Sequence, residues 1–521
     1  MSLGHGPDLA AQVDDVLSVD AEAFQNQVEE DASVIKEEVA AGTFDNPQAI
    51  IGFEYEFYAV ADEHGRHDDG GGGGALMRVP RRLLEFIGFE KELGLHNAEM
   101  STSPQPLNEY GLAAQEAEVR ARLQTAQECV GSEGMRLVSD GMWTIPPEGE
   151  TATEYLTNSI TDESITIATN MSDSVRYHAM ANRTDGLNAG MRLDVPHVSL
   201  ETDTVMPESL ITSIQPHYQV AQARDLPRHF RYALRFAGPL LALGVNAPFF
   251  PADLYDDDAS PEDILTDAWM ENRISVFETA LNPATGEKGK VRFPRDVESV
   301  EEAIDNIAED ATLVPMPVSA SDRFDDKFAH FRMKHGTYWR WVRPVFGGPT
   351  RSAANARIEF RPIPAQPTVR DSIAFQAMFA GLMESLPRRE HPVADLDWQF
   401  AEENFYAAVR DGLDADLRWI TNDGRETTRT DDIYEDIFAH AKDGLKLRGL
   451  SDEEAAKYLW PLRMRARHRY TPAQWKIDDV SERLDAGDSF EDALAGMQRK
   501  YIRKQSDTLI EGTFAKWSEG E

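Results

Sequence analysis

The chain has 521 residues, of which 52 are basic and 91 are acidic, so its formal net charge is −39 at pH 7. So acidic a surface would repel phosphates, which argues against a nucleic-acid-binding protein. Cys129 is the single cysteine, so an intramolecular disulfide and a cysteine-rich zinc site are both excluded.

The first part of the chain predicts a helical arm followed by strands and helices. Residues 9–42 are acidic and have few large apolar side chains, as in a surface helix, and residues 49–61, "AIIGFEYEFYAVA", form the first strong strand pattern. In chain order, we then expect a helix that begins at Pro80, a strand within 93–102, a long helix over 111–130 and a strand near 135–147.

The second part predicts strands up to residue 361 and helices beyond it. We expect a strand over 187–201, mostly helix over 208–244 and two strands between 339 and 361, followed by amphipathic helices from about 370. Because regular βαβ alternation is missing, an α+β fold is favoured over a doubly wound sheet. The expected division is a helical N-terminal arm (1–45), a catalytic core (46–385) and a helical C-terminal region (386–521).

Two features of the chain bear on its location. The longest apolar run, "FAGPLLALGVNAPFF", has 15 residues and holds two prolines, whereas a membrane helix needs about 20 apolar residues. The first residues, "MSLGHGPDLAAQVDDVL", lack the apolar core of a secretory signal. We therefore expect a cytoplasmic protein without a membrane partner.

Charged and apolar residues alternate in "NARIEFRPIP". On a strand, Arg357, Glu359 and Arg361 share one face, while Ile358 and Phe360 share the other. Such alternation also occurs on strands with one face in solvent. This segment by itself therefore leaves both an ion-pair ladder and a binding site open.

Carboxylates recur on the other predicted strands. In "GFEYEF", Glu54 and Glu56 lie on one face, and like charges on a common face repel each other unless a cation lies between them. Glu99 and Glu359 would be a third and a fourth such carboxylate. Because carboxylate oxygens are favoured ligands of Mg²⁺ and Mn²⁺, facing strands of this kind would form a cage for a divalent cation.

The order of these patterns resembles the glutamate-cysteine ligase family, carboxylate-amine ligases related in fold to glutamine synthetase. The resemblance covers roughly residues 49–375. It rests on seven segments, each of which is a weak match by itself, but which occur in the same order as in the family. They are "IGFEYEFYAV", "LHNAEMSTSP", "MRLVSDGMWTIP", "VPHVSLETD", "GPLLALGVNAPFF", "WRWVRPVF" and "ARIEFRPIPAQPT". The resemblance implies a curved, mostly antiparallel sheet, a glutamine synthetase-like half-barrel, covered by helices.

The resemblance also implies which residues form the site. Arg361 matches the arginine that contacts the transferred phosphate, and Arg343 matches a further anion-binding arginine. Arg273, in "WMENRISVF", and Arg357, beside Glu359, would help to bind nucleotide or substrate. The positions that match ligands of divalent cations, which bridge the phosphates of ATP, are Glu54, Glu56, Glu99, His197 and Glu359.

Three departures from the family pattern leave questions open. Pro196 precedes His197, and Ser199 and Glu201 follow it, so His197 is either a ligand or an ordinary strand histidine. The segment "FFPADLYDDDASPEDI" replaces a shorter loop, so the recognition of substrate can differ. The helices of the last 130 or so residues lie beyond the resemblance and have no assigned task.

In the family's chemistry, a γ-carboxylate attacks the terminal phosphate of ATP, and an amine then attacks the acyl phosphate to form an amide. The leading hypothesis is a glutamate-cysteine ligase that uses ATP with Mg²⁺ or Mn²⁺ and forms γ-glutamylcysteine through γ-glutamyl phosphate. A γ-glutamyl ligase for another amine and a non-catalytic protein that keeps the fold stay open. A metal-dependent phosphohydrolase usually has more Asp and His in metal-ligand spacing. The implied partners are glutamate, an amine such as cysteine, and ATP, and a homo-oligomer is allowed.

The charge balance also suggests a habitat. Only 13 of the 52 basic residues are lysines. An acidic surface with few lysines is the composition expected of a protein in molar salt, where the Debye length falls to about 3 Å and repulsion among carboxylates is screened. We interpret the chain as halophilic, with an acidic surface built for solubility at low salt as the alternative.

The first testable prediction concerns salt. We expect the melting temperature to rise as KCl is increased from about 0.1 M to about 3 M, because screening removes the repulsion among surplus carboxylates. Thermal melts across this range measure the effect. A melting temperature that does not change with salt would contradict the halophilic interpretation.

Overall fold

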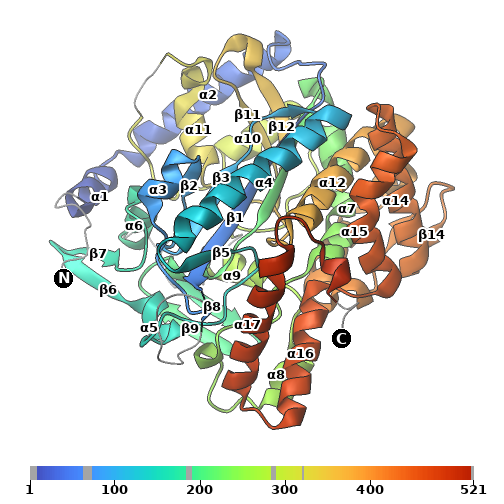
Figure 1. Ribbon diagram of the computed structural model, residues 1–521. Coiled ribbons are helices and arrows are strands. Elements are labelled where there is room, and N and C mark those ends of the chain that lie inside the picture. The colour runs from blue at the N-terminus through green and yellow to red at the C-terminus, as the bar shows by residue number, and fades with distance from the viewer. Residues whose placement is uncertain (1–8, 63–72, 184–190, 283–288, 319–321, 518–521) are drawn as a thin grey trace.

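A curved antiparallel sheet forms the centre of the computed structural model, which describes residues 9–62, 73–183, 191–282, 289–318 and 322–517. The strands follow the order β11-β12-β10-β1-β3-β2, and β4 and β5 also pair with β1 (Figure 1). The expected α+β fold, a half-barrel covered by helices, is confirmed. The strands of this sheet are β1 (Ile50–Ala61), β2 (Phe89–Lys91), β3 (Asn97–Ser101), β4 (Gln105–Pro106), β5 (Met135–Val138), β10 (Ile214–Val220), β11 (Val342–Gly347) and β12 (Asn355–Phe360).

Helices surround the sheet, and three short hairpins lie outside it. The hairpin strands are β6 (Ser159–Asp162), β7 (Ile165–Ala168), β8 (Met191–Val195), β9 (Val198–Thr202), β13 (Trp419–Ile420) and β14 (Glu426–Thr427). The helices before residue 310 are α1 (Leu9–Leu17), α2 (Ala21–Ala40), α3 (Arg81–Phe86), α4 (Glu109–Gly131), α5 (Ala152–Thr157), α6 (Val175–Ala181), α7 (Leu226–Gly244), α8 (Pro261–Asp267), α9 (Asn272–Ala280) and α10 (Val300–Ala308). Those after it are α11 (Ala329–His335), α12 (Val369–Arg389), α13 (Trp398–Asp411), α14 (Thr430–Leu447), α15 (Asp452–His468), α16 (Pro472–Ala486) and α17 (Phe490–Thr508).

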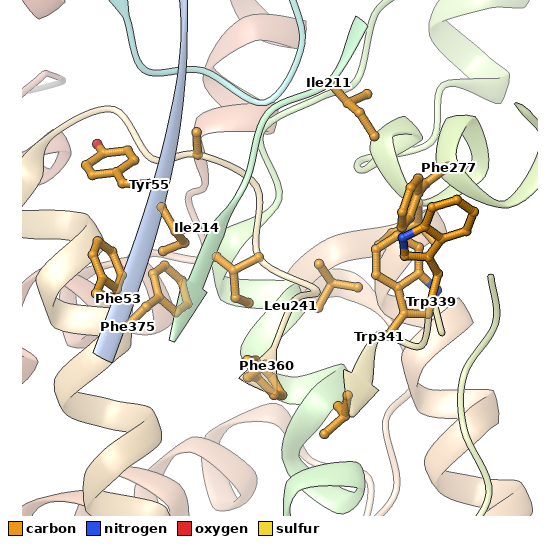
Figure 2. Packing of buried hydrophobic residues seen from close by; sticks show 14 of the residues in the cluster. Phe53, Tyr55, Ile211, Ile214, Leu241, Phe277, Trp339, Trp341, Phe360 and Phe375 are labelled. Atoms are coloured by element: carbon orange, nitrogen blue, oxygen red, sulfur yellow. The ribbon is translucent and has the colours of Figure 1, made fainter. Parts of the chain in front are cut away.

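The outer face of the sheet is apolar because every second residue of its strands is a large hydrophobic residue. Phe53 and Tyr55 of β1, Phe375 of α12 and Leu241 of α7 lie in one apolar layer (Figure 2). These four side chains are at most 1% exposed. Full burial of a side chain of this size contributes about 1.5–3 kcal/mol, so the packing holds the opposite set of side chains on the inner face.

Two glycines let α12 and α14 pack with their backbones in contact. A Cβ atom on Gly381 would lie 2.3 Å from the carbonyl oxygen of Ala441, and one on Gly444 would overlap the carbonyl oxygen of Gly381. An alanine at either position would therefore push the two helices apart. This close approach fixes α14 against α12, the helix that covers the sheet.

Buried ion pairs join the C-terminal helices to the rest of the molecule. Nη2 of Arg465, in α15, lies 2.9 Å from Oδ1 of Asp371 in α12, and Nζ of Lys476, in α16, lies 2.5 Å from Oδ1 of Asp140, which follows β5. All four side chains are at most 2% exposed. The helices beyond residue 385 thus share a core with the sheet, and the division at that residue stays a prediction.

Two expectations about the middle of the chain are wrong. Within the expected helix over 208–244, residues Ile214–Val220 form β10, the strand that pairs with both β1 and β12, and the helix begins at Leu226. The segment 187–201 is a hairpin instead of one strand, and residues 187–190 lie outside the described ranges. The hairpin turns at His197, whose φ of +62° is incompatible with a strand.

Among the helices that the structure describes, we find none with the length and apolar character needed to cross a bilayer. This agrees with the expectation drawn from the longest apolar run, because that run is split between the end of α7 and the loop after it.

The buried pair Lys476–Asp140 gives a prediction about stability. Lys476→Met would leave the Asp140 carboxyl without its cation in a site closed to water, and loss of one partner of such a pair usually costs about 3–5 kcal/mol. We expect a clear decrease in the denaturant concentration at the unfolding midpoint. Lys457→Met, on the exposed face of α15, is the matched control and should unfold like the wild type; equal midpoints for all three proteins would contradict the prediction.

Candidate active site

The register of three neighbouring strands brings the charged residues of the inner face together. Glu359 of β12 is paired with His217 of β10 on one side and with Arg343 of β11 on the other. Glu54 of β1 is paired with Gln215, two residues before His217. Because side chains on a strand alternate, these residues project from the same face of the sheet.

Glu54, His217 and Glu359 form a compact group of potential metal ligands. One ligand atom from each lies within 4.8 Å of the other two. Nε2 of His217 lies 3.3 Å from Oε1 of Glu54, and this nitrogen is buried without a hydrogen-bond partner. Two carboxylates and an unsatisfied imidazole nitrogen are therefore directed at one small volume.

Two arginines hold Glu359 in its ionised form. Nη2 of Arg343 lies 2.8 Å and Nη1 of Arg361 lies 2.5 Å from the same oxygen, Oε1 of Glu359. Burial by itself would raise the pKa of Glu359, but Arg343, Arg361 and His217 more than offset it and hold the pKa well below its usual value.

Arg357, which shares a strand face with Glu359, is not its partner; Glu359 pairs with Arg343 on the neighbouring strand and with Arg361 two residues along the chain. The Arg357 side chain lies beside the histidine instead. Arg357 donates from Nε to Nδ1 of His217 at 3.2 Å, and from Nη1 to Oδ1 of Asn355 at 3.3 Å. In this arrangement Nε2 carries the proton of the neutral imidazole, so a metal bound at Nε2 would move that proton to Nδ1 and replace the contact with Arg357.

A second group of carboxylates continues along the same face. Glu56 of β1 is directly opposite Glu99 of β3. Glu56 accepts hydrogen bonds from Nε2 of Gln215 at 2.8 Å and from the backbone N–H of Ser213 at 2.6 Å. Burial raises the pKa of both carboxyls, and in Glu99 the neighbouring charges of Glu54, Glu92 and Glu56 raise it further.

Glu92 and Glu208 add to this second group. Burial, with Glu56 close by, raises the pKa of Glu92 to about 8. Burial also raises the pKa of Glu208 well above its usual value, and the charges of Glu92 and Glu56 act in the same direction. The charge of Glu56 thus opposes the ionisation of all three of these neighbours, Glu92, Glu99 and Glu208.

The two groups of residues suit divalent cations. The first offers two carboxylate oxygens and an imidazole nitrogen, and the second offers carboxylates whose mutual repulsion a cation would relieve. Mg²⁺ and Mn²⁺ both accept such oxygen-rich surroundings. The residues present therefore fit the expectation of metal binding, with Glu54, His217 and Glu359 as the most compact set.

Arg273, in α9, lies behind the segment that follows β12. Its Nη2 donates to the carbonyl oxygen of Arg361 at 2.9 Å and also to that of Pro362, and its guanidinium is 5.2 Å from the ring centroid of Trp341. Through these contacts Arg273 fixes the backbone from which the Arg361 side chain projects. Its charge also acts on Glu56 and Glu208.

His197 does not join the group formed by Glu54, His217 and Glu359. It lies at the turn of the β8–β9 hairpin, and its Nε2 is 2.8 Å from Oδ2 of Asp267 on the last turn of α8. The hairpin forms a two-stranded sheet separate from the central one. The structure thus places His217, and not His197, beside Glu54 and Glu359.

Sequence reasoning missed His217, Glu92 and Glu208. A signal for His217 was present, because "IQPHYQV" places Gln215, His217 and Gln219 on one face of a strand. Glu92 lies between two strands, and Glu208 lies in a single turn of 3₁₀ helix (Met206–Leu210). Neither segment has a periodic pattern that could have shown which way its carboxylate points.

Comparison with protein-family models gives a match to the model of glutamate-cysteine ligase family 2 over residues 50–507. The match extends through α13 to α16 and nearly to the end of α17, beyond the residues on which the sequence resemblance depended. A search of curated protein sequences finds no match.

Two solved structures show the same fold. The glutamate–cysteine ligase of Francisella tularensis, determined in complex with AMP, gives a TM-score of 0.50 at 12% identity, over 90% of this chain and 91% of that one. A bifunctional glutathione synthetase from Pasteurella multocida also gives 0.50, at 14% identity, over 91% of this chain and 55% of that one. This chain therefore spans about half the length of the bifunctional protein.

The placement of the two histidines gives a prediction about metal binding. We expect His217→Asn to weaken Mn²⁺ binding by about tenfold or more, because loss or misorientation of a ligand at such a site has effects of about 10- to 100-fold. His197→Asn, at the turn of the β8–β9 hairpin, should change Mn²⁺ binding by less than about twofold. Titration followed by the electron paramagnetic resonance of free Mn²⁺ measures the affinity of each variant. If His197→Asn loses more affinity than His217→Asn, His197 and not His217 is the ligand.

Proposed function

We propose a function from the finding that the chain belongs to glutamate-cysteine ligase family 2. In this proposal the protein is an ATP-dependent ligase that joins the γ-carboxyl group of glutamate to the amine of cysteine. The observation that carries the proposal is the placement of Glu359 between Arg343 and Arg361 on one side and the Glu54–His217 pair on the other. Anionic and cationic groups thus alternate across a few ångströms, as the binding of a cation together with phosphates requires.

Glu54, His217 and Glu359 would hold one divalent cation, Mg²⁺ or Mn²⁺, and Glu56, Glu99 and Glu92 are suited to another. When bound, such a cation neutralises and orients the phosphates of ATP. The low pKa of Glu359 serves this role, because its carboxylate stays charged at any physiological pH. The AMP found in the Francisella tularensis enzyme supports a nucleotide site in this fold.

The arginines have the task of stabilising charge on the moving phosphoryl group. In the first step, an oxygen of the γ-carboxylate of glutamate attacks the terminal phosphorus, the bond from that phosphorus to the bridging oxygen breaks, and ADP leaves. Arg361 and Arg343 lie at the edge of the cluster with fixed guanidinium groups, so they can neutralise negative charge without reorganising. Arg273 keeps Arg361 in place by holding the carbonyl oxygens of residues 361 and 362.

In the second step, the uncharged amine attacks the carbonyl carbon of the acyl phosphate, inorganic phosphate leaves and the amine loses a proton. The substrate carboxylate is itself the nucleophile of the first step, so the chain does not need to supply one. Cysteine is the proposed acceptor because the matching family is that of glutamate-cysteine ligases. A γ-glutamyl ligase for another amine is the alternative that an acceptor panel separates from it.

The reaction gives a direct prediction. With ATP, Mg²⁺ and glutamate in molar salt, ADP release should be slow and should increase strongly when cysteine is added, because the acyl phosphate needs an amine to complete turnover. Glu359→Gln should lower this rate about a hundredfold or more, since it removes one preorganised charge and leaves Arg343 and Arg361 without their shared anion. Coupled measurement of ADP across a panel of amino acids tests acceptor and variant together.

Two further variants make the test specific. Arg361→Lys should also lower the rate, although it keeps the positive charge. An ammonium group cannot reproduce the planar two-point contact of a guanidinium with phosphate oxygens. Glu426→Gln, on the exposed strand β14, removes the same charge outside the site and should leave the rate unchanged. The ligase proposal fails if the wild type releases no amine-dependent ADP with any amino acid.

A further inference from the structure

A second group of potential metal ligands lies in the C-terminal half of the chain. Asp436 and His440 are four residues apart in α14, so they project from the same face of that helix. His391 follows the end of α12 and meets them from the neighbouring segment. One ligand atom from each of the three residues lies within 4.8 Å of the other two.

The separations within this group match a metal site without its ion. Nε2 of His391 is 3.0 Å from Oδ2 of Asp436, and Nε2 of His440 is 3.9 Å from Oδ1 of the same carboxylate. Two ligands about 2.0–2.1 Å from a tetrahedral zinc ion are roughly 3.3 Å apart. Small movements of side chains would therefore bring all three ligand atoms to bonding distance from one ion.

Neighbouring groups fix the orientation of two of the three side chains. The carboxylate of Asp436 accepts hydrogen bonds from Nε1 of Trp419 at 2.8 Å and from the backbone N–H of Asn422 at 3.2 Å. Nδ1 of His440 is 3.1 Å from Oγ of Ser385, and a bond donated to that hydroxyl leaves Nε2 free to bind a metal. Such outer hydrogen bonds are characteristic of metal-binding histidines and carboxylates.

The group is also largely closed to water. The side chains of His391 and His440 are 0% and 8% exposed, and that of Asp436 is 12% exposed. Asp436 is the most exposed of the three, and on its side a water molecule could complete the coordination of an ion.

We propose that His391, Asp436 and His440 form a binding site for a transition-metal ion of the Zn²⁺ type. Two imidazoles and one carboxylate favour such ions over Mg²⁺, which prefers oxygen ligands. The ion would join the end of α12, the β13–β14 segment that carries Trp419 and Asn422, and α14. It would therefore act as a structural cross-link, separate from the cations of the proposed ligase reaction.

A competing arrangement needs no metal. The backbone N–H of Val393 lies 3.2 Å from Nδ1 of His391. If that nitrogen accepts the bond, Nε2 carries the proton of the neutral ring and donates it to Asp436. Metal binding at Nε2 would replace this arrangement, so the experiment has to distinguish a metal site from a hydrogen-bonded pair.

The test uses the full-length protein, freed of metals with a chelator and returned to buffer with saturating Mg²⁺ to fill the oxygen-rich sites. Titration with Co²⁺ should give visible absorption typical of a four-coordinate ion, at one equivalent per chain. Zn²⁺ should abolish this absorption by displacement and should raise the melting temperature, because an ion that binds only the folded state stabilises it. A wild type that shows neither effect overturns the proposal, without recourse to any variant.

Variants locate the ion. Asp436→Asn and His440→Asn should weaken Co²⁺ binding by about tenfold or more, and Ser385→Ala, which removes an orienting partner, by about tenfold. His468→Asn, an exposed histidine in α15, is the control and should bind Co²⁺ like the wild type. Absorption that persists in both ligand variants would show that Co²⁺ binds elsewhere. Amine-dependent ADP release with Mg²⁺ should be unchanged in His440→Asn. Failure of the transition-metal proposal can therefore be told apart from failure of the ligase proposal.

Discussion

The antiparallel register of the central sheet is the constraint on which the candidate site depends. Because β12 pairs with β10 on one side and with β11 on the other, Glu359 is adjacent to His217 and Arg343 at once. A slip of one residue would turn β12 over and would place Ile358 and Phe360 on the charged face. The apolar outer face prevents this slip, since the same movement would expose its buried side chains.

The helices behind the sheet make that outer face stable, and the C-terminal helices complete it. The contact of Gly381 with α14 and the buried ion pair of Asp371 with Arg465 both involve α12, the helix that packs against β10. Ion pairs so deeply buried are costly to break, because either charge alone would lack solvation. The C-terminal region therefore supports the site from behind, and the family match over most of it agrees with this arrangement.

The charged inner face has two parts with opposite electrostatic character. Around Glu359, arginines and His217 favour ionised carboxylates, whereas around Glu99 the carboxylates are buried together and their pKa values are raised. A region of the first kind is ready to bind a cation without losing protons. A region of the second kind binds a cation more readily as pH rises, because its carboxyls must first be ionised.

The sequence by itself determined which residues share a face, because the period of two along a strand is local: it placed Glu54 and Glu359 on charged faces and predicted the helices after about residue 370. It did not identify β10, since "IQPHYQV" is a short segment next to a helical pattern and periodicity alone does not separate the two. It also did not determine the partners of Glu359. His217 and Arg343 become its neighbours through the pairing of three separate strands, and only the packing of the whole chain decides that pairing.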